Sequence, residues 1–189
     1  MRIFNQIVLA AAMCTSLTGC FPVVAGGAAA GGLAAADRRT SGAFVEDEAL
    51  EWKTNNRIKD MLGDKIHLNV TSYNRNVLLT GEAIDEDAKT KAETMAKGVE
   101  NVRHVSNELQ IAGASALTAR SNDAYLTTRV KSAFLQENRF PANYVKVVTE
   151  SSVVYLLGIV THKEADDAVE IARGIDGVQK VVKMFEYIE

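Results

Sequence analysis

The segment Leu17–Cys20 ends in a thiol that follows small and polar residues. A thiol is a potential nucleophile, and small neighbouring side chains leave room for the cleft of a modifying enzyme. Before this segment come Arg2 and an apolar run from Ile7 to Met13. This layout is typical of a secretory signal peptide, and the run is too short to span a membrane. We therefore predict that residues 1–19 are removed and that the mature chain begins at Cys20.

Leu17–Cys20 also resembles the lipobox of bacterial lipoproteins, although a chance cysteine in an ordinary signal peptide is an alternative. The resemblance implies that Cys20 carries acyl chains such as palmitate, and two or three chains would anchor the protein stably. Cys14 would leave with the signal peptide, so the mature chain would hold no disulfide. By the same resemblance, Phe21 in place of an aspartate implies sorting to the outer membrane, facing the periplasm.

Residues 20–45 are rich in alanine and glycine and lack the bulk for a core, so we predict a lipidated cysteine followed by a flexible tether. The whole chain has 21 basic against 24 acidic side chains and a formal net charge of −3. A mildly acidic protein lacks the electrostatic footprint of a nucleic-acid binder. We therefore expect no nucleic-acid partner.

The remaining side chains that could do chemistry do not form a recognisable catalytic or metal-binding set. His67, His104 and His162 lie in unlike contexts, and none has a histidine or cysteine at metal-ligand spacing. The acidic run Asp85–Asp87 is what the dipole of a helix favours in its first turn. No serine stands in a nucleophile elbow. We expect no enzyme activity, no cofactor and no metal.

An internal repeat decides the expected fold. In each copy a helix precedes two strands that are joined by a short polar turn, at 74–76 in the first copy and 150–152 in the second. A second helix then begins at a capping residue, Asp85 or Thr161, where Thr161 and Glu164 match a capping box. We predict that these helices end in left-handed caps at Gly98 and Gly174, and that a third strand closes each copy.

This order resembles the BON domain, an α/β module of bacterial envelope proteins, and two copies behind a lipobox resemble the dual-BON-domain outer-membrane lipoproteins. The residues that carry the resemblance are the repeated strands 77–81 and 155–158, the segments 98–102 and 174–178, and the opening 122–125. It implies an α+β fold of two tandem domains, each a small three-stranded sheet covered by two helices. We place the domains at 46–112 and 122–189 with a connector at 113–121, and expect them to pack on each other.

The helix that opens the second copy has the most informative surface. Leu126, Val130, Ala133 and Phe134 form its core stripe. The other side holds an aromatic, a leucine, hydroxyls and one cation, which suits a lipid headgroup boundary. The family resemblance implies that anionic phospholipid binds here, and we assign this to Tyr125, Thr128, Arg129, Ser132 and Leu135. The alternative is that Tyr125 and Leu135 pack against the first domain or the loop 138–141.

The first helix of the first copy has Leu50, Ile58, Met61 and Leu62 as its expected core, with Trp52 off that stripe. An exposed tryptophan can mark a partner contact, but we favour packing of Trp52 against the second domain. The expected function is therefore a non-enzymatic lipoprotein that binds anionic phospholipid and supports outer-membrane integrity. The alternative is a lipid-anchored adaptor for envelope or outer-membrane protein assembly machinery.

Overall fold

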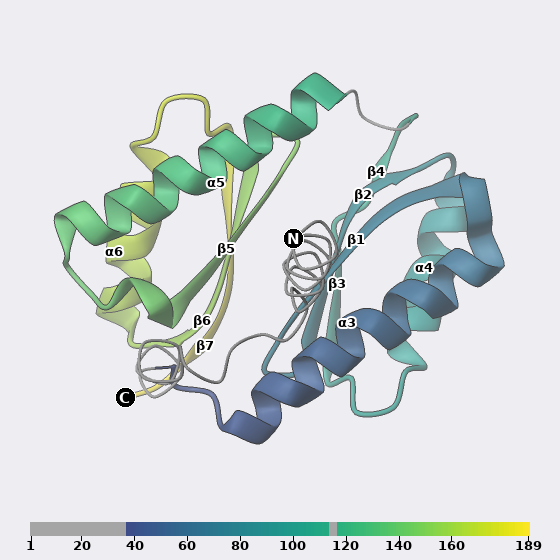
Figure 1. Cartoon of the computed structure of the whole chain (residues 1–189), viewed down its shortest axis with the longest axis horizontal. Coiled ribbons are helices and arrows are strands. Elements are labelled where there is room, and N and C mark those ends of the chain that lie inside the picture. Colours follow the sequence, from purple (N-terminus) through teal and green to yellow (C-terminus); the bar gives the residue numbers. More distant parts are fainter. Residues whose placement is uncertain (1–36, 114–116) are drawn as a thin grey trace, which may run out of the picture. The chain divides into compact units, whose positions relative to one another are not determined.

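The computed structural model describes residues 37–113 and 117–189 (Figure 1). The predicted signal peptide and Cys20 lie outside the described residues. The first copy contains α3 (Ser41–Leu62), a 3-10 turn (Gly63–Lys65), β1 (Ile66–Tyr73), β2 (Asn76–Ala83), α4 (Glu86–Lys97), β3 (His104–Asn107) and β4 (Gln110–Ile111). The second contains α5 (Leu117–Glu137), a 3-10 turn (Ala142–Tyr144), β5 (Val145–Glu150), β6 (Val153–Val160), α6 (His162–Arg173) and β7 (Lys180–Tyr187). The predicted α+β class and tandem repeat are confirmed.

Both predicted hairpins form, and each turns on two residues with positive φ. Asn74 and Arg75 have φ of 48° and 68°, and Ser151 and Ser152 have φ of 51° and 62°. Two successive left-handed residues match the right-handed twist of the flanking strands, which favours this turn in hairpins. The antiparallel registers pair Tyr73 with Asn76 and Glu150 with Val153 next to these turns.

The last strand of each copy pairs in parallel with the middle strand of its sheet. In the second copy, β7 follows β6 without interruption from Lys180 to Tyr187. In the first copy this strand is divided into β3 and β4, which both pair with β2 in one common register. The division falls at Glu108 and Leu109, where the side chain of Asn107 accepts a hydrogen bond from the Leu109 backbone N–H at 3.3 Å.

The predicted helix starts are confirmed, but the predicted left-handed ends are wrong. Asp85 accepts from the Ala88 N–H at 2.7 Å, and Thr161 with Glu164 forms the complete capping box. Gly98 and Gly174 do follow the last helical turns, yet their φ values are −84° and −74°. The chain instead takes positive φ three residues later, at Asn101 (71°) and Gly177 (98°). Backbone hydrogen bonds from Val99 to Ala96 and from Ile175 to Ala172 continue the turn beyond each glycine.

Each domain has its own core between its sheet and its two helices. The first core lies between the helix residues Ile58 and Ala92 and the strand residues Leu68 and Leu79. Met61 is wrong as a core prediction, since its side chain is 71% exposed. The buried stripe of α3 runs through Asp47, Leu50, Thr54, Ile58 and Leu62, and Met61 lies beside that stripe.

The first helix of each domain begins before the domain bound that the sequence predicts. α3 begins at Ser41, within the segment predicted as a tether, where the Thr40 hydroxyl accepts from the Ala43 N–H at 3.1 Å and caps the helix. α5 begins at Leu117, within the segment predicted as a connector. Both helices therefore extend further toward the N-terminus than the apolar periodicity of the sequence indicated.

The opposite faces of the two sheets meet in a third apolar cluster. Tyr73 and Leu78 of the first domain are buried together with Tyr155 and Leu157 of the second. Because neighbouring strand residues point to opposite faces, Leu78 contacts the second domain while Val77 and Leu79 fill the first core. The prediction that the two copies pack on each other is confirmed, and the buried surface comes from the sheets. α3 and α5 consequently cover the outer faces of their sheets (Figure 1).

Candidate functional site

The helix α5 is fixed to the second domain by one fully buried stripe. Leu126, Val130 and Phe134 are each no more than 1% exposed. These residues are spaced by four positions along the chain, which places them on one face of the helix. This face packs on the domain core, where Phe140 meets Phe134 edge-on with ring centroids 5.0 Å apart. The orientation of the opposite face of α5 is thereby set.

The five predicted lipid-binding residues lie on the outward side of α5. Tyr125 is 59% and Leu135 is 70% exposed, Thr128 is exposed, and Arg129 and Ser132 are half-buried. In the part of the chain that the structure describes, Tyr125 and Leu135 are therefore mostly exposed and not buried against the first domain or the loop 138–141, as the alternative requires.

The cation of this face is available for a ligand. The Arg129 guanidinium lies over the Tyr125 ring, 5.9 Å from its centroid. Among residues 37–113 and 117–189, no carboxylate lies within 4.0 Å of the Arg129 side chain. The Thr128 hydroxyl donates to the Ala124 carbonyl at 3.0 Å. A guanidinium without a carboxylate partner in the described residues can pair with a phosphate, while an exposed tyrosine and an exposed leucine on the same helix contact apolar chains.

The favoured prediction that Trp52 packs against the second domain is wrong. Its side chain is 68% exposed, so within the described residues it is not packed against the second domain. Val45, one heptad earlier on α3, is exposed to the same extent. Seven residues make nearly two helical turns, so both side chains lie on one outward stripe of the first domain.

The three histidines are not brought together. The His67 Nδ1 lies 2.8 Å from Oε2 of the buried Glu82, and the His162 ring stacks on Tyr187 with centroids 4.2 Å apart. His104 is exposed at the start of β3. In the described part of the chain, no group of three or more histidine, cysteine, aspartate and glutamate residues could hold a metal ion.

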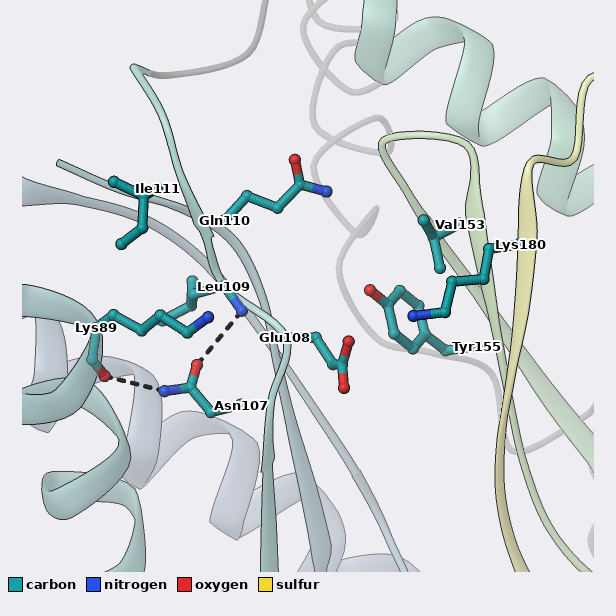
Figure 2. Close-up of a pocket in the computed structure, with 9 residues that line it drawn as sticks. All are labelled: Lys89, Asn107, Glu108, Leu109, Gln110, Ile111, Val153, Tyr155 and Lys180. Carbon is teal, nitrogen blue, oxygen red and sulfur yellow. Dashed lines mark hydrogen bonds between the residues drawn. The ribbon is translucent and has the colours of Figure 1, made fainter. Parts of the chain in front are cut away.

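A cleft of about 390 Å³ opens between the two domains, and none of the predicted site residues lines it. Figure 2 shows Glu108 of the first domain facing Tyr155 and Lys180 of the second. Burial, together with the charges of Glu108 and Glu150, raises the pKa of the Tyr155 phenol far above its ordinary value. This phenol is therefore neutral over the physiological pH range, and its ring packs in the apolar cluster between the two sheets.

The sequence analysis did not identify two buried aspartates that bind the backbone of the hairpin turns. Asp47 is 2% exposed and accepts hydrogen bonds from the backbone N–H groups of Asn74 and Arg75 at 2.8 and 2.7 Å. Asp123 does the same for Ser151 and Ser152 at 2.9 and 2.8 Å. Each aspartate thus ties its first helix to the turn of its hairpin. The available signal was an aspartate 27 positions before the first hairpin turn and 28 positions before the second.

Glu164 of α6 has a second role besides its cap. Its carboxylate accepts from the Thr161 backbone N–H at 2.8 Å and also receives Arg38 in a two-pronged ion pair at 2.7 and 2.9 Å. The hydrogen bond from Arg38 lowers the pKa of Glu164 below its ordinary value of 4.5, with burial opposing and the Thr161 hydrogen bond assisting the shift. The folded protein therefore favours the ionised carboxylate.

This shift predicts an acid-sensitive contribution to stability. A carboxyl group with a lowered folded-state pKa stabilises the fold fully above its unfolded value, and that contribution is lost as pH falls through the folded value. We expect the free energy of unfolding to decrease below pH 4.5 more steeply in the natural protein than in Glu164→Gln. Urea unfolding at a series of pH values measures both slopes, and equal slopes would contradict the prediction.

The comparison with known families settles what the fold and its repeat represent. The model of the BON domain matches residues 47–113 and 122–189. The chain belongs to the BON-domain family. Both matched segments coincide with a helix, a hairpin, a second helix and a parallel strand, so the family model and the structure divide the molecule in the same way.

Curated relatives place this BON protein more narrowly. It is 41% identical over 175 residues to the outer membrane lipoprotein DolP of Haemophilus influenzae, covering 92% of this chain and 91% of that one. It is 37% identical over 155 residues to a 21 kDa hemolysin of Actinobacillus pleuropneumoniae, covering 81% and 80%. It is 31% identical over 144 residues to the osmotically-inducible protein Y of Escherichia coli, covering 74% and 72%.

These similarities confirm the resemblance to the dual-BON-domain outer-membrane lipoproteins. No helix among the described residues is both long and apolar enough to cross a membrane.

Proposed function

We propose that this BON protein is a non-enzymatic lipoprotein, anchored in the outer membrane through lipid on Cys20 and facing the periplasm. Its second domain binds anionic phospholipid through the outward face of α5 and thereby supports outer-membrane integrity. The observation that carries this proposal is the Arg129 guanidinium, which lacks a carboxylate partner in the described chain and lies over the exposed Tyr125 ring, on the helix that also exposes Leu135.

The chemistry of the α5 face matches a headgroup boundary better than bulk water. A tyrosine places its ring at the boundary and its hydroxyl toward the polar side. An arginine offers paired donors to a phosphate, and a leucine gains free energy when acyl chains replace water around it. A lipid anchor would hold this face near the membrane, so that weak contacts are sufficient for occupancy.

A charge reversal on this face tests the proposal. A cation near an anionic membrane surface contributes about 1 kcal/mol, so reversing it removes about twice that amount. We expect Arg129→Glu to weaken binding of the non-lipidated protein to phosphatidylglycerol vesicles about thirtyfold. Vesicle sedimentation measures the affinity, and NMR shift mapping with phosphatidylglycerol micelles locates the contact on α5.

The repeat offers a matched control for this experiment. Lys53 follows Asp47 by the same number of residues by which Arg129 follows Asp123, and its side chain is exposed on α3. Lys53→Glu makes the same change of charge on the whole protein, so we expect it to leave vesicle binding nearly unchanged. Equal losses in both variants would show only a general charge effect and would refute a site on α5.

The anchor is tested separately by mass spectrometry of the mature protein. The proposal requires an N-terminus at Cys20 with acyl mass on it. A mature chain that begins elsewhere, or one without acyl mass, would remove the basis for the location.

The exposed Trp52 favours a second candidate function, a lipid-anchored adaptor. Tryptophan is enriched among residues that dominate the energy of protein interfaces, and the exposed Val45 extends the surface along α3. In this case the partner is an envelope protein such as outer-membrane protein assembly machinery, and the lipid supplies only the location. The two functions are separated by comparing phosphatidylglycerol with zwitterionic vesicles, since an adaptor is indifferent to both.

A further inference from the structure

The three residues Asp37–Arg39 lie before the first matched BON domain and contact both domains. Arg38 reaches the second domain, where it forms the two-pronged ion pair with Glu164 and donates to the Ile159 carbonyl at 3.0 Å. Its guanidinium also lies 3.9 Å from the centroid of the Tyr144 ring. These contacts engage the start of α6, the end of β6 and the turn before β5.

Arg39 reaches the first domain instead. Its side chain is only 7% exposed and pairs with Asp47 at 2.9 Å and with Asp37 at 2.7 Å. The guanidinium lies 4.1 Å from the centroid of the Tyr73 ring, and Tyr73 belongs to the apolar cluster between the sheets. Neighbouring residues of one short segment therefore hold opposite domains.

We propose that Asp37–Arg39 acts as a clasp that fixes the arrangement of the two BON domains. The clasp goes beyond the proposed lipid binding and does not depend on it. A bidentate arginine–carboxylate pair restricts direction as well as distance. Because only one peptide bond links Arg38 to Arg39, α6 cannot move away from the first domain unless Arg38 leaves Glu164 or Arg39 leaves Asp47.

The clasp is one of several contacts that hold the two domains together. The Asn74 and Asn76 amides donate to Glu186 at 2.9 and 2.6 Å, and Lys146 pairs with Glu51 at 2.9 Å. These contacts and the apolar cluster keep the domains together when the clasp is broken. The expected effect is therefore a looser arrangement of two folded domains.

The experiment uses the mature chain with Cys20→Ser, which removes its only cysteine, since Cys14 belongs to the predicted signal peptide. Spin labels attached through Lys59→Cys on α3 and Arg173→Cys on α6 report the distance between the domains by pulsed electron resonance. We expect one narrow distance distribution in the parent and a broadened or shifted one with Arg38→Glu. Glu164→Gln removes the charge of the ion pair but keeps an acceptor for the Thr161 N–H, so we expect it to broaden or shift the distribution in the same direction.

Arg139→Glu provides the control. Arg139 also pairs with carboxylates of α6, Asp167 and Glu170 at 3.6 and 3.2 Å, but it belongs to the same domain. We expect its distance distribution to match that of the parent. An unchanged distribution in Arg38→Glu, with an unchanged circular dichroism spectrum, would overturn the clasp, as would equal broadening in Arg139→Glu. No lipid is present, so the result is independent of the vesicle experiments.

Discussion

Asp47→Ala is expected to lower the free energy of unfolding by about 3–5 kcal/mol, the cost of removing one partner from a buried ion pair. The carboxylate accepts hydrogen bonds from the backbone of Asn74 and Arg75, from the Ser72 hydroxyl at 2.7 Å and from Arg39 at 2.9 Å. Alanine leaves all four donors without this acceptor, in a position that water hardly reaches. Urea unfolding followed by circular dichroism measures the loss.

The second domain supplies a graded comparison. Asp123 accepts the corresponding two backbone hydrogen bonds at the turn of its hairpin, but no ion pair of Asp123 is found within the described residues. We expect Asp123→Ala to cost about 2–3 kcal/mol, close to the value of hydrogen bonds to a charged group. An equal or larger loss in Asp123→Ala would show that the pairing of Asp47 with Arg39 adds nothing.

The local order of the fold could be predicted because its signals are local. Alternating apolar residues at 66–70 and 145–147 predicted the strands, and the polar turns after them predicted the hairpins. Asp85 and Thr161 marked helix starts, since a cap needs only a side-chain oxygen near the first free N–H groups. The repetition of these signals gave the tandem architecture before any contact was known.

Features that depend on distant contacts could not be predicted in the same way. Thr54 is fully buried on α3 although its hydroxyl has no hydrogen-bond partner among the described residues, while the more apolar Met61 is exposed. Periodicity shows that a stripe exists, but its angular position depends on the sheet beneath. The contact of Arg38 with Glu164 could not be predicted for the same reason, since the two residues are separated by 126 positions in the sequence.

The exposed face of α5 could be predicted from the sequence, but the surroundings of that face could not. The buried stripe of Leu126, Val130 and Phe134 placed Tyr125 and Arg129 on the outside of α5, because helical spacing alone determines which side chains share a face. The surroundings of that face could not be derived, since a nearby carboxylate could have come from any segment of the chain. The structure supplies that missing part by showing the Arg129 side chain without a carboxylate in the described residues.

The glycine at the end of the repeated strand 77–81 belongs to the residues that resemble the BON family, and the structure shows the physical reason for a glycine there. Gly81 has φ of +113°, and a Cβ atom there would lie 2.1 Å from the His67 carbonyl oxygen on the paired strand. Gly158 meets the same obstacle, with a Cβ position 2.5 Å from the Tyr144 carbonyl oxygen. In the first domain the backbone of β1 occupies the place where a side chain would begin. In the second domain the obstacle is the last residue of the 3-10 turn before β5.

We therefore expect Gly81→Ala to destabilise the first domain by about 4 kcal/mol, from backbone strain of about 1–3 kcal/mol together with overpacking of about 1–3 kcal/mol. Such a loss approaches the whole stability of a small domain. Thermal unfolding monitored by NMR, which resolves the two domains, measures it. Gly42→Ala is the matched control, because its Cβ would meet only the Thr40 hydroxyl oxygen at 3.9 Å. Alanine also suits the helix there, so this variant is expected to be neutral or more stable. A Gly81→Ala protein as stable as Gly42→Ala would mean that β1 can move away from β2 at little cost.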